Sequence, residues 1–286
     1  MERGLEESRQ HDESMLARYA SRGVLYPHLL PRFTRRMPGA SLENTVRWFW
    51  AATWSLPDGV ASEQSLLPFA SANLAVEPTG VTLAGPSTNA VATTLKDSGW
   101  VVAANLQPAT SAALLSCPTD MRDSTQVIVA ADLIAEIAQV FHRIEDFDNA
   151  VDVAVGALSA WIVQRVPPPR DLAIRANHLL ARIENDPNIT TLRETAEALH
   201  ISQRTAQRVA HDYIGMSVGE IIRRSRLQRA LKHAIESSTE SLATIAAANG
   251  YSDHSHMAAE FRTITRHTAT QHRAARTLRA EQPTAP

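Results

Sequence analysis

The sequence predicts an α+β multidomain protein. A small β-barrel or sandwich-like domain comes first, and an all-α domain with two helix-turn-helix modules follows. Three observations support this prediction: a helical pattern occurs twice between residues 192 and 261, short β-like runs fill the first half, and charge is divided unevenly between the halves. A length of 286 residues is enough for two domains of ordinary size.

The repeated pattern consists of a helix, a tight turn and a second helix. Each copy has an alanine in its first helix (Ala196, Ala246) and a helix-ending residue four positions later (His200, Gly250). A serine or aspartate after the break can cap the next helix by accepting a backbone N–H bond. Matching positions lie 50 residues apart before the turn and 51 after it, so the two turns differ by one residue. Such modules present their second helix to a DNA major groove.

The two copies, joined by the basic helix IIRRSRLQRALKHA, resemble the DNA-binding domain of the AraC/XylS family of transcription regulators. The resemblance rests on the runs from Ser202 to Ser217, Arg226 to Ala230 and Ile245 to Arg262, in which GYSDHSH is the most specific part. It implies a sequence-specific DNA-binding regulator whose two recognition helices enter successive major grooves on one face of the duplex.

One face of the first recognition helix carries Arg204, Gln207 and Arg208. Arginine can read guanine N7/O6 and glutamine can read adenine N6/N7, whereas Arg208 can instead clamp a phosphate or brace the fold. In the second recognition helix, His256 is expected either to contact DNA or to have a structural role only. The resemblance and the polar faces together predict a DNA-contacting set: Ser202, Gln203, Arg204, Gln207, Arg208, His211, Arg226, Arg229, Ser252, His254, Ser255, His256, Arg262 and Arg273.

Some positions depart from the family's pattern. Ala206 and Ala210 stand where the family usually has leucine and phenylalanine, so we expect a thin core in the first module. His200 replaces the turn glycine and, at positive φ, would be strained by about 1 kcal/mol. Val218 replaces the usual proline.

The first half reads as short strands separated by turns. The runs VRWFWAATW, NLAVE, VTLAG, AVATTL and WVVAANL are β-like, LPDG is a turn, and hairpins are predicted at Pro78–Gly80 and Asp97–Gly99. Four tryptophans either pack in this domain or line a ligand pocket: Trp48, Trp50, Trp54 and Trp100. The words RWFWAATWSLPDG, LLPFASANLAVE and AANLQPA resemble the β-rich N-terminal domain of many actinobacterial AraC-like regulators.

From Ala131 the apolar period becomes helical, in ADLIAEIAQVFHRI and then VDVAVGALSAWIVQRV. These helices either form a dimer or coupling element or pack against their own β domain. The predicted divisions are a flexible N-terminus (1–20), a β-rich sensor domain (21–125), a helical segment with a proline-rich linker (126–169), the DNA-binding domain (170–280) and a tail (281–286).

Charge separates the two halves. Residues 170–286 have 16 Lys and Arg against 12 Asp and Glu, whereas residues 1–169 have 12 against 18. A basic half beside an acidic half fits a nucleic-acid module joined to another domain. The polar N-terminus, the absence of a long apolar run and the single cysteine, Cys117, favour a cytoplasmic protein without a membrane span.

The expected partner is double-stranded DNA. A small-molecule effector in the N-terminal domain, RNA polymerase and a homodimer are left open as further partners. We predict no enzyme activity and no cofactor. Gly215–Gly219 matches G-x-S-x-G, but it lies between predicted helices, so Ser217 is interpreted as a helix cap rather than a nucleophile.

One rival from another class is a metal-binding or enzymatic β-barrel tethered to DNA. The N-terminal half holds only three histidines, His11, His28 and His142, which are far apart in the sequence. This spacing disfavours a metal site built from them.

Overall fold

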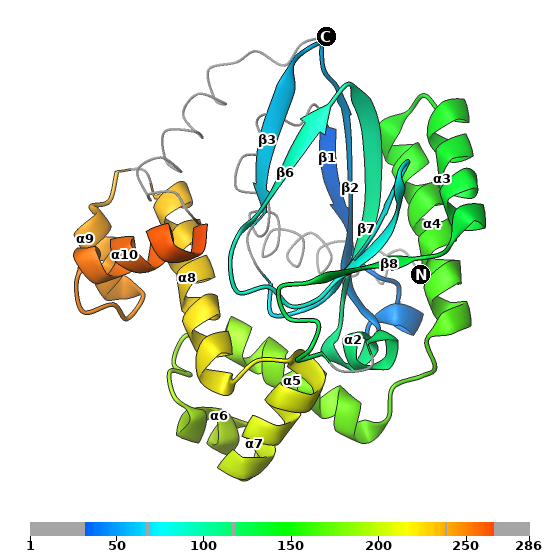
Figure 1. Ribbon diagram of the computed structural model, residues 1–286. Helices are drawn as coiled ribbons and strands as arrows, with labels where there is room; N and C mark the ends of the chain where they lie inside the picture. Colours follow the sequence, from blue (N-terminus) through cyan, green and yellow to red (C-terminus); the bar gives the residue numbers. More distant parts are fainter. Residues whose placement is uncertain (1–31, 67–68, 116–117, 238, 266–286) are drawn as a thin grey trace, which may run out of the picture.

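A computed structural model describes residues 32–66, 69–115, 118–237 and 239–265. The chain has a β-rich N-terminal region followed by an all-helical C-terminal region, which confirms the predicted fold class (Figure 1). The predicted flexible N-terminus and tail, Cys117 and Arg273 lie outside the described residues.

The main β structure is a six-stranded antiparallel sheet in the order β1-β2-β7-β4-β5-β8. Its strands are β1 (Arg32–Arg36), β2 (Val46–Ser55), β7 (Ser98–Leu106), β4 (Asn73–Glu77), β5 (Gly80–Ala84) and β8 (Thr125–Ile128). A second sheet consists of β3 (Ala61–Leu66) paired with β6 (Val91–Lys96). The larger sheet ends at β1 and β8, so the described strands form an open sheet and not a closed barrel.

One of the two predicted hairpins is present. β4 and β5 pair across Pro78 and Thr79, with Glu77 opposite Gly80. The hairpin predicted at Asp97–Gly99 is wrong, because β6 pairs with β3 whereas β7 pairs with β2 and β4. The burial of the strands explains this: β7 is buried over most of its length and needs neighbours on both edges, while β6 is largely exposed. Asp97, at φ 51°, redirects the chain between them.

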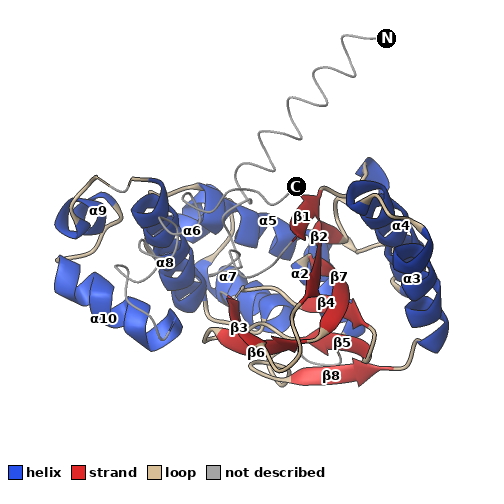
Figure 2. Ribbon diagram, turned by 90° about the horizontal axis from the view of Figure 1, so that it is seen from above, coloured by secondary structure: helices blue, strands red, loops and turns tan. Residues whose placement is uncertain are grey.

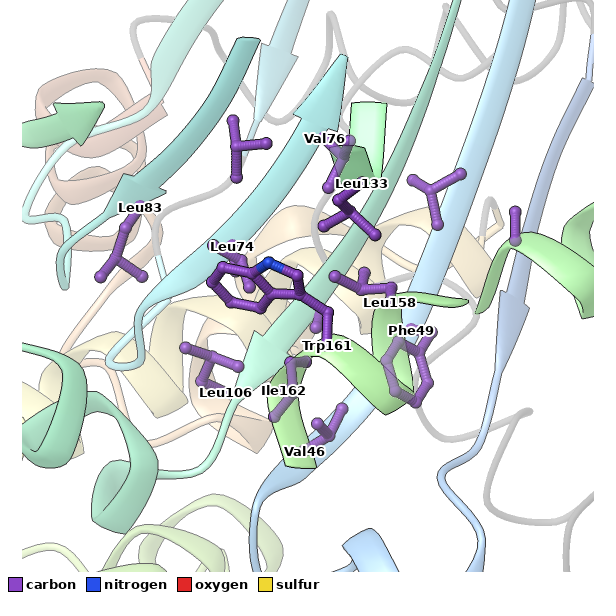
Figure 3. Close-up of a cluster of buried hydrophobic side chains, with 14 of the residues drawn as sticks. Val46, Phe49, Leu74, Val76, Leu83, Leu106, Leu133, Leu158, Trp161 and Ile162 are labelled. Atoms are coloured by element: carbon purple, nitrogen blue, oxygen red, sulfur yellow. The ribbon is translucent and has the colours of Figure 1, made fainter. Parts of the chain in front are cut away.

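Alternate residues of β7 serve two different cores. Val102, Ala104 and Leu106 face helices α3 (Ala131–Arg143) and α4 (Phe147–Arg165), which contribute buried side chains such as Leu158 and Trp161 (Figure 3). Figure 2 shows these two helices side by side along the sheet. Of the two roles predicted for them, the described contacts favour packing against their own β domain.

The opposite face of the sheet carries a smaller cluster that includes Val101 and Ala103 with partly buried aromatic rings. Trp50 stacks on Phe33, with ring centroids 6.1 Å apart, and its indole N–H donates to Asn73. Trp48 is 1% exposed. The other two predicted tryptophans also have packing contacts, since Trp54 covers Gly99 and Trp100 stacks on Phe141.

The C-terminal region has two hydrophobic cores, one for each helix-turn-helix module. Its helices are α5 (Asp171–Asn185), α6 (Leu192–Ala198), α7 (Gln203–Val209), a π-helical turn (Ala210–Ile214), α8 (Val218–Glu236), α9 (Leu242–Ala248) and α10 (His254–Thr265). Two short helices precede them in the β-rich region, η2 (Ala40–Leu42) and α2 (Pro108–Leu114). Among the described helices, none has the length and hydropathy needed to cross a membrane.

Candidate nucleic-acid interface

The two helix-turn-helix turns have the same backbone geometry. After α6, the N–H of Ile201 donates to the carbonyl of Ala196 at 3.0 Å, and after α9 the N–H of Tyr251 donates to that of Ala246 at 3.0 Å. This bond satisfies a carbonyl that the helix end leaves free, and it requires a left-handed residue just before the donor. His200 (φ 54°) and Gly250 (φ 74°) hold these positions, which confirms the repeat and the positive φ of His200.

We expect opposite stability changes at these equivalent positions. Glycine adopts positive φ without the steric cost that a Cβ brings, so His200→Gly should raise the free energy of unfolding by up to about 1 kcal/mol. Gly250→Ala should lower it by a similar amount, because the added Cβ meets no atom within 4 Å and only the backbone cost remains. Thermal or urea unfolding of both variants measures this, and two changes of the same sign would contradict it.

The residue that caps the recognition helix differs between the modules. Ser202 caps α7, since its Oγ accepts a bond from Thr205 N at 3.1 Å. Asp253, not Ser252, takes this role at α10, where its carboxylate accepts from His256 N at 2.8 Å. The bond from His256 N lowers the pKa of Asp253. This shift of the cap by one position accounts for the change of offset from 50 to 51, and it places Ser255 at the equivalent of Arg204.

Six of the predicted DNA-contacting side chains are exposed and have no hydrogen bond or ion pair with the described residues. They are Gln203, Arg204 and Arg208 on α7, and His254, Ser255 and Arg262 on α10. The two faces differ strongly in chemistry. α7 presents two arginines on its outer face, whereas the equivalent positions of α10 hold Ser255 and Ala259.

Two predicted DNA-contacting arginines on the linking helix α8 have partners within the protein. Arg226 forms an ion pair with Glu260 at 3.1 Å and lies over the ring of Tyr251, 4.3 Å from its centroid. Arg229 donates to Ser225 Oγ within α8 at 2.7 Å and to the carbonyl of Ile183 in α5 at 3.4 Å. Both side chains therefore connect helices in the structure, and the sequence alone did not indicate which arginines of this helix would turn inward.

The remaining predicted positions have local partners. His256 contacts Ser252 Oγ at 3.2 Å and packs its ring edge-on against Tyr251. His211 Nδ1 lies 3.0 Å from Asp212. Gln207 is exposed, but its side-chain oxygen accepts a bond from the backbone of Val218 at 3.2 Å. The predicted thin core of the first module is seen in Ala206 and Ala210, both fully buried.

The C-terminal modules match a known domain family in sequence. Residues 195–275 match the family described as a helix-turn-helix domain, which spans both turns and both recognition helices. Residues 195–275 are therefore a helix-turn-helix domain of the AraC type, as their resemblance to AraC/XylS regulators predicted. The chain is a DNA-binding transcription regulator.

Other comparisons of the chain give matches of low similarity or to a domain of unknown function. Residues 34–127 match a domain of unknown function (DUF6597), and no curated protein matches the chain. ToxT from Vibrio cholerae O395 has a TM-score of 0.45 and 10% identity, covering 79% of this chain and 97% of ToxT. Its complex with (E)-4-(8-methylnaphthalen-1-yl)but-3-enoic acid gives 0.44 and 11%, covering 85% and 98%. The AraC-like transcriptional activator CuxR gives 0.23 and 11%, covering 70% and 93%.

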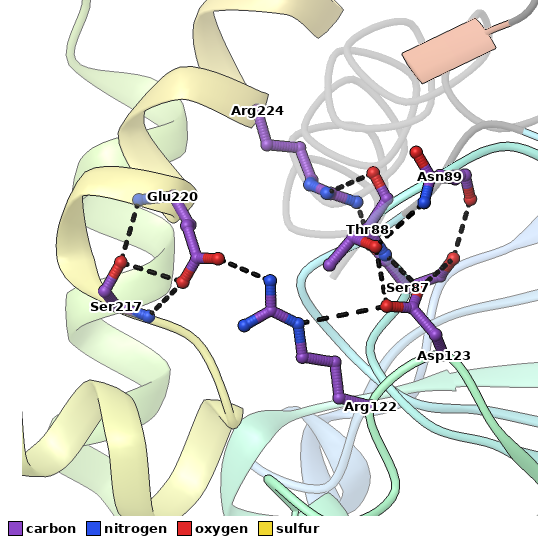
Figure 4. Close-up of polar contacts among 8 residues, drawn as sticks. All are labelled: Ser87, Thr88, Asn89, Arg122, Asp123, Ser217, Glu220 and Arg224. Carbon is purple, nitrogen blue, oxygen red and sulfur yellow. Dashed lines mark hydrogen bonds and ion pairs between the residues drawn. The ribbon is translucent and has the colours of Figure 1, made fainter. Parts of the chain in front are cut away.

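A polar cluster joins the β-rich region to the linking helix (Figure 4). Arg122 forms an ion pair with Glu220 in the first turn of α8. Arg224 donates to the carbonyls of Ser87 and Thr88, the latter at 2.9 Å. Burial lowers the pKa of Arg224 to about 10, so the guanidinium remains a cation at neutral pH. Asp123 supports the same loop by accepting bonds from the backbone and hydroxyl of Thr88.

Hydrogen bonds lower the pKa values of two carboxyls in this cluster. Burial alone would raise the pKa of Asp123, but the bonds from Thr88 and Ser87 hold it below the ordinary value. The pKa of Glu220 is lowered in the same way, against burial, by Ser217 and Arg122. Both groups are therefore charged at neutral pH, and the cluster joins the two regions through paired charges.

The β-rich region also contacts both modules directly. At the first module, Asn177 of α5 accepts a bond from Ala109 N at 2.9 Å, and Glu184 forms a buried ion pair with Arg47 of β2. At the second module, Ala90 N donates to Ile264 O, 2.7 Å away at the end of α10. Sequence analysis missed these contacts, because partners 68 to 174 residues apart along the chain leave no local pattern.

Proposed function

We propose that α7 and α10 enter successive major grooves of the duplex and that α7 supplies most of the base readout. The observation that carries this proposal is Arg204, which is exposed on the outer face of α7 and has no hydrogen bond or ion pair with the described residues. Arginine is the residue that most often contacts guanine in the major groove. The equivalent face of α10, with Ser255 and alanines, offers fewer strong donors, so we assign it a weaker contribution to specificity.

Phosphate contacts are assigned to the exposed cations that flank these faces. Arg208 and Arg262 lie toward the C-terminal halves of α7 and α10, where they can reach the backbone beside the groove. Arg226 and Arg229 are assigned a bracing role instead, since Arg226 pairs with Glu260 of α10 and Arg229 donates to the carbonyl of Ile183 in α5. The proposed DNA-binding unit is residues 170–280, which begins with α5.

We infer that the β-rich region regulates this unit. The inference is supported by its contacts with both modules: Glu220 and Arg224 on the linking helix, Glu184 on α5 and Ile264 on α10. A small-molecule effector or a second copy of the chain that moved this region would alter the spacing of the recognition helices. RNA polymerase is the further partner that such a regulator would contact.

The metal-binding alternative finds no support in the described residues, which contain no group of three His, Cys, Asp or Glu side chains that could hold a metal ion. We infer that this chain acts as a regulator without catalysis. The match to a helix-turn-helix domain and the exposed recognition helices support this inference.

A salt titration of DNA binding tests this proposal. The logarithm of the binding constant should fall linearly with the logarithm of salt concentration, by about 0.9 for each neutralised phosphate. Arg208→Ala should make the slope shallower by about 1 if this side chain clamps a phosphate. Fluorescence anisotropy with a labelled duplex measures both slopes. A folded full-length chain that fails to bind any duplex at low salt would contradict the proposal.

A further inference from the structure

Gln207 lies on the exposed face of α7 that also carries Arg204 and Arg208. The inference drawn from it rests on the proposed function of that face. Its Oε1 atom accepts a hydrogen bond from the backbone N–H of Val218, 3.2 Å away. No hydrogen bond joins its Nε2 atom to the described residues, and the side chain as a whole is exposed. The oxygen of the amide therefore accepts a bond within the protein, whereas its nitrogen is available to donate to a partner.

The start of α8 explains why this bond forms. Val218 is the first residue of the helix, so its N–H has no partner within the helix. The capping box around it serves other groups: Ser217 Oγ accepts from Glu220 N, and Glu220 accepts from Ser217 N. Val218 is fully buried, so water does not replace the missing acceptor. Gln207 satisfies this buried N–H of Val218, which the capping box does not serve.

This bond also determines which way the amide of Gln207 points. A backbone N–H can only donate, and within a glutamine side chain only the oxygen accepts. Turning the amide over would place two donors face to face and leave a buried N–H unsatisfied, which is unfavourable. The orientation is therefore set by the chemistry of Val218 and not by an arbitrary choice between two similar atoms.

A glutamine that reads adenine uses both ends of its amide, donating to N7 and accepting from the N6 amino group. Gln207 has only its donor end free. We propose that Gln207 is a donor-only reader, which selects guanine or thymine over adenine, and that Val218 is the residue that positions it. Guanine offers two acceptors, O6 and N7, and thymine offers O4, whereas adenine offers N7 alone and places the donor N6 amino group beside it.

Val218→Pro tests the proposal, because proline has no N–H and releases the oxygen of Gln207. Proline is well tolerated at the first position of a helix, and Ser217, at φ −73° and ψ 153°, already has the extended conformation that a residue before proline prefers. Val218→Ala is the matched control, because it trims the same side chain but keeps the N–H. Selection of binding sites from randomised duplexes gives the base preferences of each full-length variant.

Gln207→Ala first locates the position, or column, of the aligned binding sites that this side chain reads, because that column should lose its base preference. In the wild type and in Val218→Ala, the column should favour guanine or thymine. In Val218→Pro, adenine should gain on the order of ten-fold at this column, as the bidentate contact becomes available. A wild-type column that favours adenine, or a Val218→Pro column identical to wild type, would overturn the inference while leaving base readout by α7 intact.

The same experiment separates this inference from the proposed function. If Gln207→Ala changes no column, Gln207 is not a base reader and this inference is overturned, whereas base readout by Arg204 stands. Amide hydrogen exchange keeps the inference testable even if Val218→Pro does not fold. The N–H of Val218 should exchange several-fold faster in Gln207→Ala than in the wild type, and equal rates would show that the bond to Gln207 does not hold it.

Discussion

Glu184→Gln is expected to lower the free energy of unfolding by about 3–5 kcal/mol, because it leaves the guanidinium of Arg47 buried without its counter-charge. The two side chains are 6% and 4% exposed and join β2 to α5. Arg47 also donates to Ser71 Oγ at 3.2 Å and lies 4.7 Å from the ring centroid of Trp48, so it is held in place and cannot reach water.

Urea unfolding of the full-length chain measures the effect. Glu197→Gln is the matched control, because it removes the same charge from a pair with Arg193 in which both side chains are more than 60% exposed. That pair should contribute only about 0.3–0.5 kcal/mol. The replacement of both buried partners, Arg47→Met with Glu184→Leu, should recover much of the lost stability. Equal effects of the two single substitutions would contradict the importance of burial here.

Arg204→Ala is expected to weaken binding to the preferred DNA site by about 1–3 kcal/mol and to relax base preference at the position it reads. The side chain lies in the first turn of α7, is exposed, and has no partner among the described residues. Its loss therefore removes a contact with DNA without breaking one within the protein, and the free energy of unfolding should change little.

Arg229→Ala is the control for this prediction. That arginine holds Ser225 and the carbonyl of Ile183, so its loss should lower stability while base preference stays the same. Binding to the preferred duplex and to an unrelated duplex, measured for both variants, distinguishes the two roles. An Arg204→Ala variant that binds both duplexes as the wild type does would contradict the assignment.

The helix-turn-helix repeat was predictable because its signals are local. An alanine, a left-handed residue and a capping side chain within eight residues describe each turn, and the bonds to Ala196 and Ala246 follow from them. The change of offset between the copies was visible too, but its cause, a cap at Asp253 in place of Ser252, depends on a side-chain rotamer that the sequence does not specify.

Strand pairing was less predictable. Pro78-Thr79-Gly80 forms its hairpin because two neighbouring strands meet there, whereas Asp97-Ser98-Gly99 carries an equally good turn signal and separates two sheets. The two turns differ because β7 has a distant partner. It pairs with β2, a largely buried strand with aromatic side chains that lies more than 40 residues earlier in the chain. The ion pair of Arg226 was not predictable for the same reason, because its partner Glu260 lies 34 residues away along the chain.

The most direct test of the central claim is a binding-site selection with the wild-type, full-length chain. Two recognition helices in successive major grooves predict an enriched motif with two half-sites, their centres about 10–10.5 base pairs apart. The half-site with the stronger base preferences should lose them in Arg204→Ala, since α7 carries the arginines. A folded chain that enriches no motif, or a single half-site that Arg204→Ala leaves unchanged, would contradict the claim.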